Sequence, residues 1–257
     1  MTVVPYEWQI WTDGPAREDW PLEKAAACLA ASLRRITRTL PSDAGAFQAG
    51  ADGPPFSVND PDLPRHLVPQ LAASRDRSRY GGGDLLGNAR ILLQPVGPGL
   101  LWLDWSQPAA ELPTSRANLR VTVTARLGPI LDERLGEVAA LVADLGRIWE
   151  ADQAWVDMVH VRQEWNRWRR GLPVFGVVTW FRTGGATVDT SGLDVDTVDT
   201  DDGRLIVLRA APADVEADTS AAARATVREL TRRTVLADGR LLTEANPALL
   251  AEPEGPS

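Results

Sequence analysis

The spacing of the apolar residues changes along this chain, and these changes limit the folds that it can adopt. Two long stretches, about residues 19–40 and 129–149, carry apolar side chains at intervals of three and four, as an amphipathic helix does. Between and after them, shorter runs alternate apolar and polar residues with the period of two that is typical of a half-buried strand. This order lacks strict strand–helix alternation, so it favours the α+β class.

Three helices are predicted. The first has Asp19 as its expected N-cap and stops before Pro41, the second begins near Pro129, and the third covers about residues 219–236. The segment between Ser42 and Asn88 is rich in Pro and Gly and predicts a long loop, with only a short helix near Pro64–Ala73.

The strand-like runs predict a sheet under these helices. We expect an antiparallel or mixed β-sheet with about three main helices packed on it, in which the first strand is closed by a turn at Asp13-Gly14-Pro15. The predicted strands are Tyr6–Thr12, Ile91–Leu93, Leu100–Trp105, Leu119–Ala125, Trp155–Val161, Val174–Phe181 and Leu205–Leu208.

The length of 257 residues fits one large domain or two small ones. We expect a single α+β domain over residues 1–245. A two-lobed arrangement, 1–127 and 128–245, is the alternative, because both halves run strand, long helix, strands. Residues 246–257 are rich in Pro, Glu and Gly and predict a flexible tail.

The composition predicts a cytoplasmic protein without a membrane span. The N-terminus has no signal-peptide pattern, and no run of about 18 apolar residues occurs. The single cysteine, Cys28, cannot form an internal disulfide. With only His66 and His160 beside it, the chain has too few ligands for a Cys/His zinc site, and no cofactor is predicted.

The usual catalytic motifs are absent from the sequence. No serine has the Gly-x-Ser-x-Gly context of a nucleophile elbow, and Gly81–Gly87 matches neither a dinucleotide fingerprint nor a P-loop. We therefore predict that the protein is not an enzyme. The alternative is an enzyme of unknown substrate that uses carboxylates, in which Asp104, Glu164 or the Asp194–Asp202 group would converge in a cleft.

Six aspartates fall within fourteen residues and supply much of the chain's net charge of −8. An EF-hand loop with its glycine at Gly203 would begin at Val198 and end at Arg209, which are wrong ligand types, so no metal is predicted. The run is interpreted either as a solvated loop or as a surface for a basic partner. Its members are Asp189, Asp194, Asp196, Asp199, Asp201 and Asp202.

Trp165 and Trp168 alternate with arginine, a composition found at single-stranded nucleic-acid sites. A chain with a charge of −8 lacks the broad basic face that such binding needs, so no direct nucleic-acid contact is predicted. Trp and Arg also dominate protein–protein hot spots, so this segment is a candidate for partner contact. The alternative is a loop whose two tryptophans fold back on the core.

The stretch from Pro173 to Phe181, with the Gly203-Arg-Leu-Ile strand that follows, resembles the C-terminal half of the immunity protein 52 family of bacterial polymorphic toxin systems. Members of that family carry a Pro-x-x-Gly-Trp-x-Thr-Tyr-like strand and then a Gly-x-Leu-Ile strand. The chain matches that pattern at Pro173, Gly176 and Thr179, and differs from it in having Val177 for the tryptophan and Trp180 for the tyrosine.

The resemblance implies an antitoxin that binds and blocks a cognate toxin, often a nuclease, and performs no catalysis. A nuclease presents basic residues to phosphate, and an acidic protein can cover them. A scaffold with no toxin partner is the alternative, and the oligomeric state is not predicted. The candidate contacts are Asp194, Asp196, Asp199, Asp201, Asp202, Trp165 and Trp168.

Overall fold

The computed structural model of the protein describes residues 7–40, 46–50, 52–75, 89–96, 101–107, 116–124, 127–158, 172–209 and 221–247. Its helices are α1 (Leu22–Thr39), α2 (Leu63–Ser74), α4 (Leu127–Ile148), α7 (Ala221–Arg233) and α8 (Leu242–Ala245). Its strands are β1 (Glu7–Pro15), β2 (Phe47–Ala49), β3 (Ala89–Pro95), β4 (Leu101–Gln107), β5 (Arg116–Thr124), β6 (Gln153–Met158), β7 (Val178–Arg182), β8 (Thr187–Val188), β9 (Val195–Thr200), β10 (Gly203–Leu208) and β11 (Thr234–Val235).

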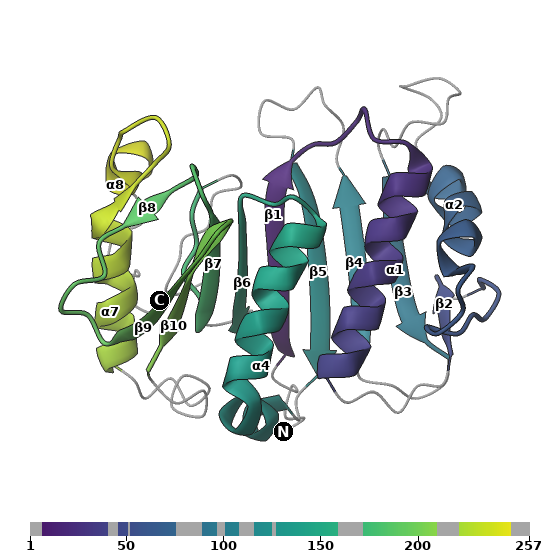
Figure 1. The fold of residues 1–257 in the computed structure, drawn as a ribbon, viewed down its shortest axis with the longest axis horizontal. Helices are drawn as coiled ribbons and strands as arrows, with labels where there is room; N and C mark the ends of the chain where they lie inside the picture. The colour runs from purple at the N-terminus through teal and green to yellow at the C-terminus, as the bar shows by residue number, and fades with distance from the viewer. Residues whose placement is uncertain are drawn as a thin grey trace, which may run out of the picture.

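Nine of these strands form one sheet in the order β2-β3-β4-β5-β1-β6-β7-β10-β9. Every pairing in it is antiparallel, and the β3-β4-β5 meander appears as the sequence predicts. Figure 1 shows α1, α2 and α4 on the near face of this sheet. The predicted α+β class, with helices packed on an antiparallel sheet, is therefore confirmed.

The apolar stripe of α1 forms a large part of the core, as its period predicts, because Leu29, Leu33 and Ile36 are fully buried. The predicted cap is wrong: α1 begins at Leu22 with Pro21 as N-cap and without a side-chain cap bond. The Pro21 carbonyl accepts the Lys24 and Ala25 N–H groups, so the first turn closes without the Asp19 carboxylate.

The helix α7 belongs to a second, smaller core at the β9 end of the sheet. Alternation along the strands sends Trp180 and Leu205 into the main core with α4, whereas Phe181 and Ile206 face the other way and pack in a cluster that includes Val227 of α7. The sheet is therefore covered on opposite faces at its two ends.

The predicted turn at Asp13-Gly14-Pro15 is wrong, since β1 continues through these residues and pairs with β5 as far as Pro15. A side chain at residue 14 would be too close to the segment after α4, because a Cβ at Gly14 would lie 2.9 Å from the Ala151 Cα atom. The Asp13 carbonyl accepts the Asp152 N–H at 2.9 Å. The glycine thus allows close packing here.

The Pro- and Gly-rich segment after α1 contains more structure than predicted. The short helix near Pro64–Ala73 is confirmed as α2, and the strand β2 was missed. Strand β1, from the first predicted lobe, pairs with β6 from the second. The predicted tail lies outside the described residues beyond residue 247.

Candidate partner-binding surface

The motif that carries the family resemblance lies in the interior. The Gly176 N–H donates a hydrogen bond to the Thr179 Oγ1 atom at 3.0 Å, and the Val177 N–H donates to the Val156 carbonyl at 2.9 Å. A Cβ at Gly176 would lie 2.0 Å from the same carbonyl oxygen. Gly176 and Thr179 therefore shape the junction between β6 and β7.

Trp180 of the same motif is 1% exposed and lies between two glycines. A Cβ at Gly146 of α4 would lie 2.4 Å from the Trp180 Cε3 atom, and one at Gly203 of β10 would lie 2.4 Å from its Nε1 atom. The two halves of the family pattern, Trp180 and Gly203, are thus packing partners. Trp180 and Gly203 therefore contribute to the packing of the fold and not to a contact surface.

The aspartate run forms the border of the sheet at its β9 end. The sequence suggested a loop, but Val195–Thr200 is the strand β9, which pairs with β10 through a turn at Asp201 and Asp202. We call residues 189–202 the acidic edge. Charged side chains are common on terminal strands, where they discourage uncontrolled pairing with other chains.

Arginines contact most carboxylates of the acidic edge. Arg209 approaches Asp196 at 2.8 Å and Asp194 at 3.7 Å, and Arg204 approaches Asp199 at 2.5 Å. The hydrogen bond from Arg204 holds the pKa of Asp199 below its usual value.

Two further aspartates have arginine partners from helices. Arg147 of α4 contacts Asp202 at 2.5 Å, whereas Arg233 of α7 reaches Asp189 only at 4.0 Å. Within the described part of the chain, Asp201 forms no ion pair. The acidic edge is therefore partly neutralised by the protein's own cations, and Asp201 is the carboxylate that the described residues leave without a cation.

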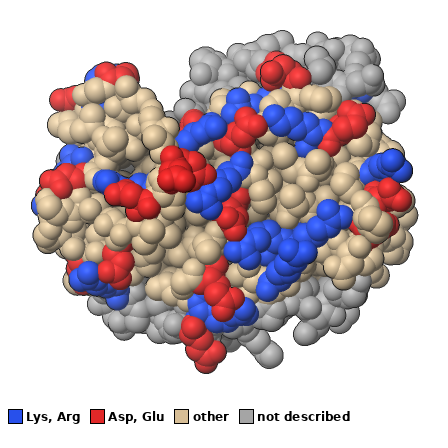
Figure 2. Space-filling model, in the orientation of Figure 1, with Lys and Arg blue, Asp and Glu red and all other residues tan. Residues whose placement is uncertain are grey.

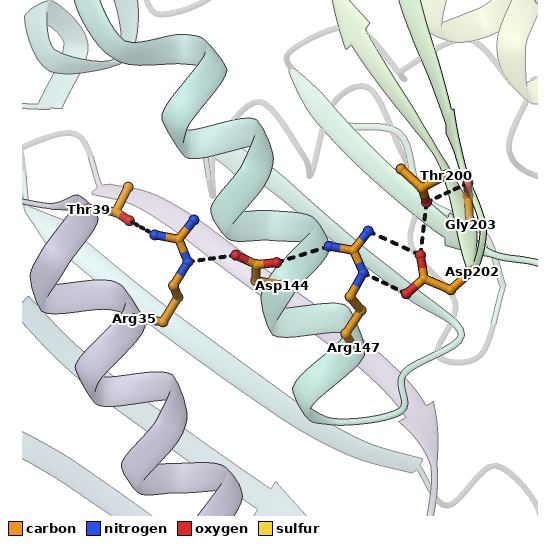
Figure 3. A network of polar contacts seen from close by, with 7 residues as sticks. All are labelled: Arg35, Thr39, Asp144, Arg147, Thr200, Asp202 and Gly203. Carbon is orange, nitrogen blue, oxygen red and sulfur yellow. Dashed lines mark hydrogen bonds and ion pairs between the residues drawn. The ribbon is translucent and has the colours of Figure 1, made fainter.

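A chain of polar contacts connects this edge to the helix layer (Figure 3). Arg35 of α1 donates to Asp144 at 2.6 Å, Arg147 donates to Asp144 at 2.9 Å and to Asp202 at 2.5 and 3.0 Å, and the Thr200 hydroxyl donates to Asp202 at 2.9 Å. Figure 2 shows positive and negative side chains intermixed over this face. The turn between β9 and β10 is thus fixed to α4.

Replacing Asp202 with asparagine is expected to make the protein less sensitive to acid. The Arg147 hydrogen bond lowers the folded-state pKa of Asp202. Such a pair stabilises the fold above the unfolded pKa of about 3.9, and this stabilisation is lost as the pH falls below it. The free energy of unfolding, measured with urea, should therefore fall less between about pH 6 and about pH 3 for Asp202→Asn than for the wild type. Asp201→Asn, from the same turn, is the control, because Asp201 forms no ion pair in the part of the chain that the structure describes, and the difference between the two variants isolates the pair with Arg147.

The other sequence candidates can be placed relative to this surface only where they fall within the described residues. Trp165 and Trp168 lie outside the described residues, as do His160, Glu164 and Gly81–Gly87. Asp104 on β4 binds Arg90 and Arg120, and five strands separate it from β9. Asp104 therefore cannot share a cleft with the Asp194–Asp202 group.

Two remaining titratable groups also lie elsewhere. His66 is exposed beside Asp60, at 3.1 Å. The Cys28 thiol donates to the Ile148 carbonyl, and burial raises its pKa to about 11. Among the described residues, no three or more His, Cys, Asp or Glu side chains are grouped to hold a metal ion. No helix within those ranges is long and apolar enough to cross a membrane.

A groove beside the acidic edge could not be found from the sequence, because its walls come from separate segments. It has a volume of about 720 Å³ and lies between residues 192–194 and α7. Three arginines, Arg224, Arg228 and Arg232, line it at four-residue intervals, which place them on one face of the helix. The surroundings of the acidic edge are therefore of mixed charge.

The chain shows little similarity to known proteins. No family model and no curated protein matches the chain. A solved structure, the Pseudomonas aeruginosa T6SS protein PA0821, is similar with a TM-score of 0.44 and 10% sequence identity. The match covers 79% of this chain and 64% of that one, so the chain spans less than two thirds of its length. The resemblance of residues 173–181 to the immunity protein 52 family stays a prediction.

Proposed function

We propose that the protein is an immunity protein that binds a toxin with a basic surface and blocks it. The observation that carries the proposal is the acidic edge, where exposed carboxylates are concentrated on the terminal strand of the sheet. The side chain of Asp199 is 70% exposed, and that of Asp194 is 66% exposed. A basic partner would meet these groups first.

The internal ion pairs do not prevent such binding. Exposed pairs of this kind contribute only about 0–1 kcal/mol, so a partner's lysine or arginine can share or replace them at small cost. Complementary charge would mainly raise the association rate, and the apolar contacts made afterwards would slow dissociation.

The sequence is also compatible with two other functions. A carboxylate-using enzyme would need its acidic groups together, and the distance between β4 and β9 along the sheet removes Asp104 from such a site. An interaction scaffold without a toxin partner could use the same acidic edge. Only the identity of the partner separates it from an immunity protein.

The direct test of the function is co-expression with the product of the neighbouring gene. We expect that product to be toxic alone, to become harmless when this protein is present, and to co-purify with it. An unrelieved toxicity together with no complex would refute the proposal. A complex with a non-toxic product would support the scaffold instead.

Reversing the charge of Asp201 tests the role of the acidic edge in that complex. Asp201→Lys should lower the association rate on the order of fivefold at low salt and less at high salt, because screening weakens long-range attraction. Stopped-flow mixing measures both rates. The control is Asp52→Lys, which reverses an exposed carboxylate near β2, at the other end of the sheet. Equal rates for the two variants would show that the acidic edge does not guide association.

A further inference from the structure

The two terminal strands of the nine-stranded sheet differ in whether their outward backbone groups have hydrogen-bond partners among the described residues. At one end, Phe47 of β2 exchanges two hydrogen bonds with Phe56, at 2.9 and 2.8 Å, so a following segment partly covers that strand. At the other end, no second strand pairs with β9 in the part of the chain that the structure describes. Among the described residues, strand β9 is therefore an open edge.

The register shows which backbone groups point outward. The Arg209 N–H donates to the Asp194 carbonyl, and the hairpin turn joins Thr200 to Gly203. Alternation in an antiparallel pair then directs the N–H and C=O groups of residues 196 and 198 toward β10, and those of Thr197 and Asp199 away from it. These two residues offer two donors and two acceptors to an incoming strand.

The side chains along this edge define the kind of strand that fits. Val198 is 52% exposed, although it is opposite the buried Leu205 in the register. Asp196, Asp199 and Asp201 flank it, while Arg204 belongs to β10 and Arg209 follows it, one strand further in. An approaching chain therefore meets carboxylates and one aliphatic side chain, with the guanidinium groups of Arg204 and Arg209 beside Asp199 and Asp196.

We propose that β9 accepts an extended basic segment of a partner protein as a tenth strand of the sheet. The segment alternates lysine or arginine with aliphatic residues, so that the cations lie on the face of Asp199 and an aliphatic residue covers Val198 on the opposite face. Backbone hydrogen bonds to Thr197 and Asp199 provide affinity that does not depend on sequence, and the carboxylates select for positive charge. That the partner is a toxin rests on the function proposed above.

Charge also excludes the other obvious occupant, a second copy of this chain. A second β9 would bring its own Asp196 and Asp199 to the pairing and no lysine or arginine from that strand. Like charges across neighbouring strands are destabilising. Charge therefore disfavours pairing of β9 with a second copy of this chain and favours pairing with a basic strand.

A peptide experiment tests the inference without the natural partner. The probe is a short peptide of alternating lysine and valine, and calorimetry measures its affinity for the full chain. Thr197→Pro removes an outward N–H while leaving the hydrogen bonds to β10 in place, so it should weaken binding at least tenfold. Thr197→Val keeps the N–H and should bind like the wild type, and a peptide of alternating glutamate and valine should not bind.

A second measurement uses only the wild-type protein and decides the matter if Thr197→Pro does not fold. The lysine–valine peptide should slow amide hydrogen exchange at Thr197 and Asp199 and leave residue 52, near the other end of the sheet, unchanged. Equal affinity of Thr197→Pro and Thr197→Val, no protection, or no binding would each overturn strand addition. None of these results bears on toxin neutralisation, which the co-expression experiment decides separately.

Discussion

Gly176→Ala is expected to destabilise the protein by about 3 kcal/mol or more, at the upper end of what an overpacked core position costs. The added Cβ would lie 2.0 Å from the Val156 carbonyl oxygen, a backbone atom that cannot rotate away. Moving that carbonyl would disturb its hydrogen bond with Val177 and the start of β7. For a chain of this size the midpoint of thermal unfolding should fall by roughly 10 °C.

Gly136→Ala in α4 is the matched control, because nothing lies within 4 Å of a Cβ at that position. Alanine is preferred over glycine in a helix by about 1 kcal/mol, so this variant should be as stable as the wild type or slightly more stable. Urea unfolding of both variants measures the difference. If Gly176→Ala were as stable as Gly136→Ala, the close packing of Gly176 against the Val156 carbonyl would be refuted.

Trp180→Ala is expected to cost about 3–5 kcal/mol, the usual range for truncating a large buried aromatic side chain. The ring lies between Gly146 and Gly203, and neither glycine has a side chain to fill the resulting cavity. Urea unfolding gives the free energy, and near-UV circular dichroism reports whether the remaining core stays ordered.

The same packing predicts that the effect of Gly146→Ala depends on Trp180. In the wild type the new Cβ would lie 2.4 Å from the ring, so the variant should be destabilised. In the Trp180→Ala background that overlap is gone, and alanine should be neutral or stabilising in α4. A double-mutant cycle measures this change of sign. Equal costs in both backgrounds would place the origin of the effect outside the contact between α4 and β7.

The sequence predicted those parts of the fold where one face of an element is buried. The helices α1 and α4 and the meander β3-β4-β5 carry strong apolar periods, and all of them are present. Strand β9 has no such period, since its exposed residues are mostly polar and Val195 is its buried side chain. A terminal strand needs few buried residues, so its sequence resembles that of a loop.

The candidate site was only half predictable for a related reason. The aspartates form a visible run, and Arg204 and Arg209 follow it closely in sequence, but the partner of Asp202 comes from a distant helix. Arg147 and Asp202 are 55 residues apart in sequence, and only the packing of α4 against the β10 end of the sheet brings them together. Tertiary structure, not spacing, thus decides that Asp202 has an arginine partner whereas Asp201 has none among the described residues.

The polar chain from Arg35 to Asp202 also bears on the entropy of binding. Asp202 is held by Arg147 and by Thr200, so the turn beside β9 is ordered before any partner arrives. A preorganised surface loses little conformational freedom on association, and the cost of ordering then falls on the incoming segment. A partner that presents these residues on a preformed strand should therefore bind more tightly than a partner that presents the same residues on a disordered segment.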